Sequence, residues 1–586
     1  MALNSADPEQ NRFIDRTREA LRQGDLLRAC DIAEEGLLIH SQDKALAYGL
    51  VLACARLGKL DQAMALHDVH GLSGPDEGLD AHSLRARILK DMALSERPPD
   101  RGKLAEAIGA YRDAYQRFGD PFPGINAASL MLLAGDGDGA RELAAALLDM
   151  PRLRTPEGYY DTVTRAEALL ILGRTAETAQ AVTEGCALVD ANPGARAGTR
   201  RQLRLIAQRL NLDAETMEAL LAPLAPPTVA VFGGQMFEAD AAGEAALAEE
   251  IDAVVRRQGV GFAYGALAAG ADIVIAERLL ELGVELNVVL PFRTDDFIAA
   301  AVGRDAGWTA RFEACLKRAA SVSHATEASY VGDPHQIRFG ADVAMGMAKL
   351  RAAALDAQTV QIAAWDGAPG LTADDVARWR AHGGVTETVV PRFAARRAVG
   401  GPTPPQADRV VKAIIFTDFP GFSKLSEAVL PAFWREVMQR IAVVLARHEG
   451  AIAYRNTWGD ALYAVIDTAA EAAAIALELH DELANVDHQV LEIDRTAGMR
   501  IGAHLGPIYR GPDFVTGSLN FFGTEVSRTA RIEPITPPGA VYVTEPFAAI
   551  LALEAPGRFG CDYVGRLELP KAFGVQRMYR LGRGAS

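Results

Sequence analysis

Two aspartates in the last third of the chain carry its clearest chemical signal. Asp418 ends the apolar run VKAIIFTD, and Asp460 follows Gly459 in the turn of a predicted hairpin, GAIAYRNTWGDALYAVID. If the first strand lies beside the hairpin, the two carboxylates converge. Carboxylates beside a triphosphate can hold two divalent cations, Mg²⁺ or Mn²⁺. One cation would lower the pKa of an attacking hydroxyl, and the other would offset charge on the leaving group.

The loop DFPGF, which follows the first of these strands, is suited to phosphate. Gly421 allows the backbone to approach closely, and we expect the N–H groups that open the next helix to face the phosphates. A lone aspartate at a strand end is more typical of a turn or a cap. The prediction of a site therefore depends on the combination of both aspartates with this loop.

The surrounding segments predict a ferredoxin-like α/β sandwich with the order βααββαβ. After the hairpin, MRIGAHLGPIYRG gives a further strand. A helix over Phe522–Ile532 then ends before a Pro–Gly turn and a final strand. Both aspartates are thus expected at strand ends of one sheet.

Several motifs appear in one order in this region: FTDFPGF, NTWGD, MRIGAHLG, VSRTARIE and PGAVYV. With their spacing, residues 410–586 resemble the class III adenylate/guanylate cyclase homology domain. The resemblance implies conversion of a nucleoside triphosphate, ATP preferred, into a 3′,5′-cyclic nucleotide and pyrophosphate with two metal ions.

The resemblance also implies a role for each matching residue. Arg531 corresponds to the arginine that stabilises the charged transition state, a task that suits a planar and permanently charged guanidinium. Ser527 stands at the position of the transition-state asparagine. The remaining expectations are metal binding by Asp418, Asp460 and Phe419; phosphate binding by Gly421, Phe422, Arg500 and Lys571; and base reading by Asn456 and Asn520.

Three of these positions depart from the usual adenylate cyclase pattern. Asn456 replaces a base-reading lysine, Asn520 replaces its partner aspartate, and Ser527 replaces the asparagine. Asparagine can both donate to and accept from a base edge, so the two positions leave the base open between adenine and another choice, including cyclic CMP, UMP or GMP products. Losing one donor in the transition state typically costs about 10²–10³ in rate, so we expect a slow or tightly regulated enzyme. A degenerate nucleotide-binding or dimerisation module is the alternative.

The family builds its active site across a dimer interface, so a chain with a single cyclase domain is expected to form a homodimer with two symmetric sites. Rotation of the subunits would then be a natural point of control.

Residues 1–222 predict an α-solenoid, because small residues recur in the segments LRQGDLLRACDIA and ARLGKLDQAMALH. Gly24 and Gly58, like Ala29 and Ala63, are offset by the tetratricopeptide period, and the region resembles a tetratricopeptide-like solenoid. We expect the small residue to let one helix pass close to the next. An ordinary helical bundle remains the alternative, and either fold offers a platform for a protein partner.

Residues 223–392 alternate strands with helices, which predicts a parallel α/β sheet. The segment YGALAAGADIVIAERLLELGVELNVVLPF resembles the Rossmann-like SLOG/LOG group. Glycine turns at Gly233–Gly234 and Gly265–Gly270 fall at strand ends, where such sheets bind ligands, so the region is either a sensor or a structural spacer. Residues 393–409, rich in Gly, Pro and Arg, are a predicted linker.

Composition narrows the class of protein. The chain has 586 residues with a net charge of −16, which argues against nucleic acid and anionic lipid as partners. Five cysteines without a CxxC pair fit a reduced, cytoplasmic compartment. The sequence predicts no membrane span and no signal peptide.

Overall fold

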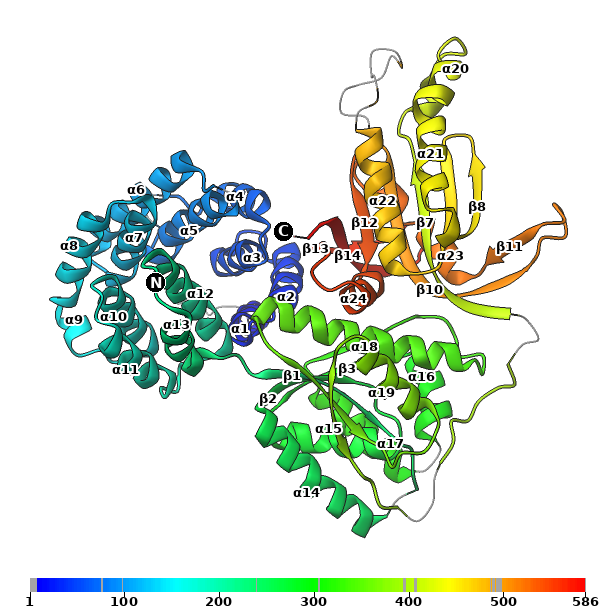
Figure 1. The fold of residues 1–586 in the computed structure, drawn as a ribbon, viewed down its shortest axis with the longest axis horizontal. Coiled ribbons are helices and arrows are strands. Elements are labelled where there is room, and N and C mark those ends of the chain that lie inside the picture. Colours follow the sequence, from blue (N-terminus) through cyan, green and yellow to red (C-terminus); the bar gives the residue numbers. More distant parts are fainter. Residues whose placement is uncertain are drawn as a thin grey trace. The chain divides into compact units, whose positions relative to one another are not determined.

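The computed structural model describes residues 8–74, 77–96, 98–238, 240–303, 306–393, 397–404, 408–484, 486, 491 and 498–584. The chain forms two compact units, Met1–Pro226 and Pro227–Ser586 (Figure 1). The second unit contains two separate sheets. The predicted domain boundaries at residues 222, 392 and 409 stay predictions. No helix in the described part of the chain is both long and apolar enough to cross a membrane.

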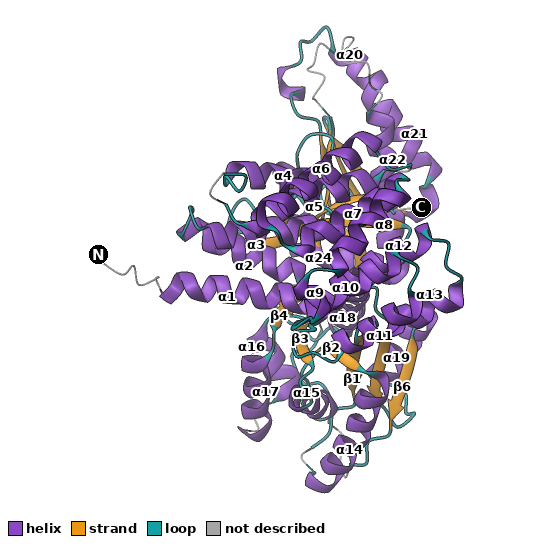
Figure 2. Cartoon of the chain, turned by 90° about the vertical axis from the view of Figure 1, so that its left-hand side faces the viewer, coloured by secondary structure: helices purple, strands orange, loops and turns teal. Residues whose placement is uncertain are grey.

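The described part of the first unit is built from helices, whereas the strands belong to the second unit (Figure 2). Consecutive helices pack against each other, and their interiors are dominated by Ala and Leu. The helices are α1 (Pro8–Gln23), α2 (Leu26–Ile39), α3 (Lys44–Arg56), α4 (Leu60–Val69), α5 (Leu79–Ser95), α6 (Arg101–Phe118), α7 (Pro121–Ala134), α8 (Gly137–Leu148), α9 (Pro151–Arg154), α10 (Tyr159–Ile171), α11 (Thr175–Cys186), α12 (Pro193–Arg209) and α13 (Ala214–Leu221), with the 3₁₀ turn η1 (Ala222–Leu224).

The repeated glycines have a different role from the one expected. Gly24 and Gly58 lie in the turns after α1 and α3, with φ of 70° and 80°. A Cβ at Gly58 would meet nothing within 4 Å. Glycine is therefore needed for the left-handed backbone and not for close helix approach. The repeated Ala29 and Ala63 are fully buried, as the helix contact requires.

The first sheet of the second unit is parallel in all its described pairings, with the order β4-β3-β2-β1-β5-β6. Continuous apolar runs fill its central strands, which fits a sheet covered on both faces. Its strands are β1 (Thr228–Gly234), β2 (Val260–Gly265), β3 (Glu285–Leu290), β4 (Ser321–His324), β5 (Thr359–Ala364) and β6 (Val385–Val389). Its helices are α14 (Ala241–Gln258), α15 (Ala271–Glu281), α16 (Thr294–Phe297), the π-helix η2 (Ile298–Val302), α17 (Ala306–Arg318), α18 (Pro334–Leu355) and α19 (Leu371–Ala381).

The second sheet is mixed and follows the order β13-β14-β12-β10-β7-β9-β8, with β11 paired to β10. Its strands are β7 (Asp408–Asp418), β8 (Ile452–Trp458), β9 (Ala461–Ile466), β10 (Arg500–Pro512), β11 (Leu519–Phe522), β12 (Val541–Thr544), β13 (Phe559–Glu568) and β14 (Val575–Arg583). Its helical elements are η3 (Phe422–Lys424), α20 (Leu430–Phe433), η4 (Trp434–Met438), α21 (Gln439–Arg447), η5 (Glu449–Ala451), α22 (Ala469–Leu483), α23 (Thr524–Thr529), η6 (Glu533–Ile535) and α24 (Glu545–Glu554).

Two local expectations for this sheet were wrong. The helix expected over Phe522–Ile532 is only Thr524–Thr529, because Phe522 ends β11 and Gly523 takes a φ of 141°. The phosphate loop runs into the short 3₁₀ turn η3, and the first α-helix begins later, at Leu430. The predicted hairpin and the strand from Arg500 are present.

Candidate active site

Asp418 lies at the end of β7, which is flanked by β9 on one side and β10 on the other. In the β7–β9 pairing Thr417 lies opposite Leu462, so the turn before β9 brings Asp460 to the same sheet end. In the β7–β10 pairing Arg500 lies directly opposite Asp418. The strand order alone therefore places two carboxylates and one guanidinium together.

Asp460 is held in place by the loop that follows β7. Its side chain is 9% exposed, and one carboxylate oxygen accepts a hydrogen bond from the backbone N–H of Phe419 at 3.0 Å. Burial raises the pKa of Asp460, and the nearby charge of Asp418 adds to this rise while the Phe419 hydrogen bond opposes it. The two carboxylates therefore lie close enough to raise the pKa of Asp460, which favours a bound cation between them.

A third carboxylate, Glu533, belongs to this cluster and was missed in the sequence. Its carboxylate forms an ion pair with Nε of Arg500 at 2.7 Å, and another nitrogen of Arg500 donates to Asp418. Burial raises the pKa of Glu533 to about 7, with the charge of Asp418 as the next cause. The motif VSRTARIE contains Glu533, but only the packing of η6 on β10 and β7 brings it beside Arg500 and Asp418.

The loop after Asp418 is anchored by aromatic packing. The Phe419 ring is 2% exposed and meets Phe433 edge to face, with centroids 5.4 Å apart, and the Phe422 ring lies 4.9 Å from Phe433. Gly421 has a φ of 95°, and an added Cβ would meet nothing within 4 Å. The glycine therefore serves the backbone turn and leaves the loop surface open.

The residues present fit a metal–nucleotide complex better than a closed metal cage. Among the described residues no group of three or more His, Cys, Asp or Glu is arranged to hold a metal ion. Asp418 and Asp460 would bind it, with the backbone of Phe419 beside them. Mg²⁺ commonly uses one or two protein carboxylates and completes its shell with water and substrate phosphates.

Arg531 lies just after α23. In the described structure it forms no hydrogen bond or ion pair with the cluster of Asp418, Asp460 and Glu533. Its guanidinium lies over the Phe573 ring at 5.7 Å, and its Nε is buried without a hydrogen-bond partner in the described structure. No carboxylate of the described residues forms an ion pair with it. Ser527, one turn earlier on α23, is exposed. Within the described part of the chain, Arg531 therefore has no anionic partner.

The other predicted residues lie away from the aspartates, and none of them bonds to Asp418 or Asp460 in the described structure. Asn456 is exposed on β8 and accepts from the N–H of Thr457 at 2.9 Å. Asn520, on β11, accepts from its neighbour Phe521 and donates to Asp513. Lys571 is exposed in the β13–β14 turn, with a φ of 61°.

Two protein-family models match parts of this chain. Residues 405–582 match the family model of the adenylate and guanylate cyclase catalytic domain, and residues 25–131 match that of the tetratricopeptide repeats-sensor. A search of curated proteins found no significant match.

Solved structures of low sequence identity also match. The guanylate cyclase domain of RhGC from Catenaria anguillulae, in complex with GTP, is 19% identical, with 30% of this chain and 100% of that chain covered and a TM-score of 0.27. The adenylyl cyclase CyaB from P. aeruginosa is 14% identical over 31% of this chain and 98% of that one, with a TM-score of 0.27. The guanylyl cyclase Cya2 is 23% identical over 30% and 95%, with a TM-score of 0.26.

The motifs and the family matches lead to one conclusion: the chain carries a class III nucleotidyl cyclase catalytic domain at residues 405–582, preceded by an N-terminal tetratricopeptide-like region.

Proposed function

We propose that this domain converts a nucleoside triphosphate into a 3′,5′-cyclic nucleotide and pyrophosphate by two-metal catalysis. The observation that carries the proposal is the convergence of Asp418 and Asp460 at one end of the sheet, beside an open glycine loop. Two Mg²⁺ or Mn²⁺ ions, when bound there, would lower the pKa of the 3′-hydroxyl and offset the charge of the triphosphate.

The side chains of the domain would divide the remaining work. The loop from Phe419 to Phe422 would orient the phosphates through its backbone. The Arg500 guanidinium and a metal ion would compete for the carboxylate of Asp418. Binding of the metals would therefore release Arg500 to contact a phosphate oxygen. Arg531 would stabilise the negative charge that develops on the oxygens around the reacting phosphorus, assisted by the shorter donor Ser527.

We further infer a homodimer, in which a second copy completes each site. In the described structure, Asn456 and Asn520 do not bond to Asp418 or Asp460, which fits base-reading residues that act on the partner's nucleotide. Large apolar side chains are also exposed on the same sheet: Trp458 is 88% exposed, and Phe514 and Val515 at the β10–β11 tip are 94% and 95% exposed. A second copy of this chain would cover such side chains.

Two residues bear on the choice of base. ATP is our first choice, and another base is the alternative, because Asn456 and Asn520 are neutral and can serve either purine or a pyrimidine. A catalytically degenerate module is disfavoured by the presence of both aspartates and of Arg531 without an ion-pair partner among the described residues.

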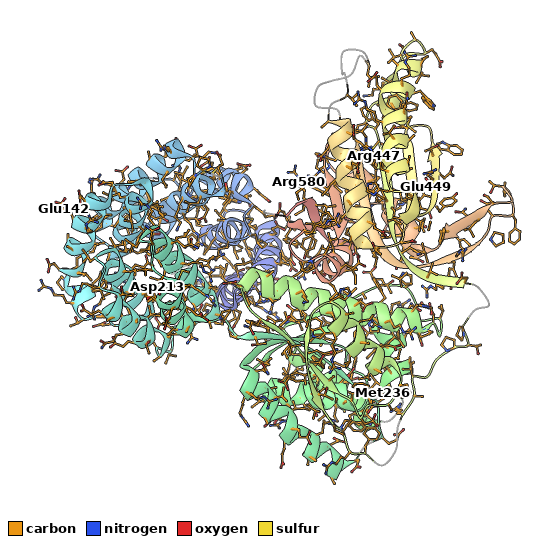
Figure 3. The ribbon with its side chains drawn as sticks, in the orientation of Figure 1. Glu142, Asp213, Met236, Arg447, Glu449 and Arg580 are labelled. Atoms are coloured by element: carbon orange, nitrogen blue, oxygen red, sulfur yellow. The ribbon has the colours of Figure 1, made fainter. Side chains whose placement is uncertain are left out.

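The first sheet of the second unit is proposed to be a Rossmann-like sensor. A cavity of about 470 Å³ lies at the carboxyl ends of its strands and is lined by Gly233, Gly234 and Gly265 (Met236, also lining it, is labelled in Figure 3). Arg397 of the linker lines the same cavity, so a ligand there would touch the segment that leads to β7.

The helical unit is proposed to bind a protein partner.

Complementation tests the proposed shared site. Asp418→Asn and Arg531→Ala are each expected to be inactive as homodimers. When the two variants are mixed, heterodimers have one intact site and should recover up to half of the wild-type turnover per dimer. If mixing restores nothing although heterodimers form, the site is not shared between two copies.

A further inference from the structure

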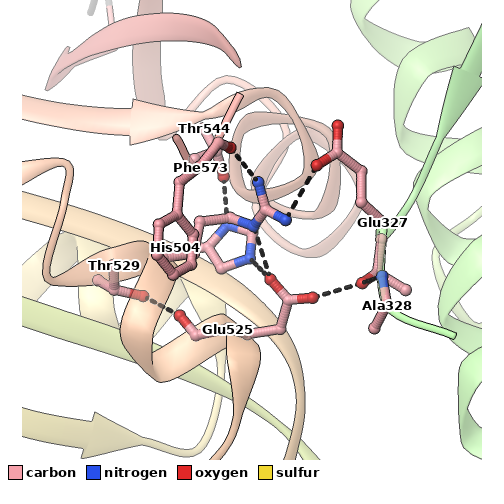
Figure 4. A network of polar contacts seen from close by, with 9 residues as sticks. Glu327, Ala328, His504, Glu525, Thr529, Thr544 and Phe573 are labelled. Carbon is pink, nitrogen blue, oxygen red and sulfur yellow. Dashed lines mark hydrogen bonds and ion pairs between the residues drawn. The ribbon is translucent and has the colours of Figure 1, made fainter. Parts of the chain in front are cut away.

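Helix α23 is held by polar contacts that reach it from the segment after β4 (Figure 4). Thr326 donates a hydrogen bond to Glu525, and Glu327 forms an ion pair with Arg528 at 3.2 Å. Glu525 and Arg528 lie one turn apart on α23, and Ser527 lies between them in the sequence. All of these residues belong to the compact unit Pro227–Ser586.

The inner part of this network is removed from water. Glu525 is 1% exposed, while Thr326 and Arg528 are each 4% exposed. Arg528 also donates to Glu525 at 3.0 Å, and the N–H of Ala328 donates to the Thr326 hydroxyl at 3.0 Å. A buried charge is stable only while its partners compensate it. Loss of one contact would therefore destabilise the remaining contacts of the network.

The cyclase sheet supplies the other side of the network. His504 on β10 lies 2.9 Å from Glu525 through Nε2 and 2.7 Å from the hydroxyl of Thr544 through Nδ1. Burial alone would raise the pKa of Glu525, but His504, Arg528 and Thr326 outweigh it and bring the pKa to about 2. Glu525 is therefore a buried anion at neutral pH, fixed from two sides.

The network continues to the predicted catalytic arginine. Arg528 donates to the backbone carbonyl of Phe573 at 3.4 Å, and the Phe573 ring lies under the guanidinium of Arg531. Ser527 and Arg531 are four positions apart, and Arg531 follows Arg528 by three positions, just beyond the end of α23. An isolated helix of six residues has no stability of its own, so its orientation depends on these contacts.

A second contact joins the parallel-sheet region to the cyclase region. Helix α18, which follows Thr326 and Glu327 in the chain, packs on α24 so closely that a Cβ at Gly346 would lie 2.0 Å from the Ala549 carbonyl oxygen. The face of α18 that carries Gly340 and Ala344 lines the cavity of the parallel sheet. Because α18 begins only a few residues after Glu327, movement of α18 would also shift the segment that holds α23.

We propose that Thr326 and Glu327 are positioning residues of the cyclase reaction, which act through Glu525 and Arg528 to set the orientation of Ser527 and Arg531. The proposal rests on the function proposed above. It makes the parallel α/β segment a direct determinant of turnover, because the correct placement of Arg531 requires contacts from outside the cyclase sheet.

The test compares the variants Thr326→Val and Glu327→Gln with the control variant Glu313→Gln. Glu313 is exposed on α17, one of the helices of the parallel-sheet region. We expect kcat to fall at least tenfold in Thr326→Val and about threefold in Glu327→Gln, whose side chain is 54% exposed, while KM changes less than twofold. Glu327→Asp should recover part of the loss. In an Arg531→Lys background the effect of Thr326→Val should shrink, since both act at one step.

Hydrogen exchange of residues 523–532 gives a second measurement that does not need turnover. The α23 amides should exchange faster in Thr326→Val than in Glu313→Gln. Equal exchange, or kcat values within twofold of Glu313→Gln in both variants, would overturn the positioning role. If the wild type forms no cyclic product from any nucleoside triphosphate, the proposed function fails, and exchange alone decides whether Thr326 positions α23.

Discussion

Arg500 and Asp418 lie directly opposite each other on β10 and β7, and their side chains form an ion pair at the predicted metal site. The guanidinium also meets Glu533 at 2.7 Å. A cation that binds Asp418 must therefore displace a positive charge that already neutralises it.

Arg500→Met separates the two roles of this arginine. Without the competing guanidinium, Asp418 should bind free Mn²⁺ several-fold more tightly, whereas KM for the metal–nucleotide complex should rise because a phosphate contact is lost. Calorimetric titration with Mn²⁺ and steady-state kinetics measure the two effects. Arg510→Met is the matched control, because Arg510 pairs with Asp408 at the other end of the same two strands. Weaker Mn²⁺ binding in Arg500→Met would contradict the competition.

Arg531→Lys tests the predicted transition-state role. Lysine keeps the charge but loses the planar set of donors, so kcat should fall about 10²–10³-fold with little change in KM. Arg566→Lys, an exposed arginine on β13, should leave kcat unchanged. A rise in KM with normal kcat would instead assign Arg531 to ground-state binding.

The strand that ends at Asp418 and the hairpin turn that carries Asp460 could be predicted because both are local features, whereas their approach rested on the assumption that the strand lies beside the hairpin, as β7 does beside β9. Glu533 was missed because its position depends on the packing of η6 on β10 and β7, which no local pattern specifies. Likewise, Thr326 and Glu525 are 199 residues apart, and only tertiary packing joins them. The helix near Ser527 was predicted too long. The spacing of apolar residues did not reveal that Phe522 belongs to the strand β11.

Stability of the metal-free protein should fall as pH rises through the region of the Glu533 pKa. The folded pKa of about 7 lies above the ordinary value of 4.5, so the native protein binds a proton that the unfolded chain has released between these values. The raised pKa of Asp460 acts in the same direction. The contribution is complete below pH 4.5 and is lost as pH passes 7.

Thermal unfolding without metal, measured at pH 5.5 and pH 8, checks this dependence. Glu533→Gln should show a smaller loss between the two pH values than the wild type, and the exposed Glu568→Gln should match the wild type. An equal loss in all three proteins would show that Glu533 does not titrate in this range.

The fragment Pro227–Ser586 should fold and retain basal turnover, because it forms a compact unit without the helical region. Removal of Met1–Pro226 should alter the response to whatever partner binds the helices. Analytical ultracentrifugation and turnover of the fragment measure both properties. A fragment that is folded and dimeric but inactive would mean that the helical unit takes part in basal catalysis.

Identification of the product tests the central claim most directly. The purified chain is incubated with ATP, GTP, CTP or UTP in Mg²⁺ or Mn²⁺, and the products are separated and weighed by mass spectrometry, with Asp418→Ala beside it. We predict a 3′,5′-cyclic nucleotide and pyrophosphate from at least one triphosphate, with ATP as the first choice, and loss of that product in Asp418→Ala. No cyclic product from any triphosphate, or equal product from Asp418→Ala, would contradict the two-metal cyclase.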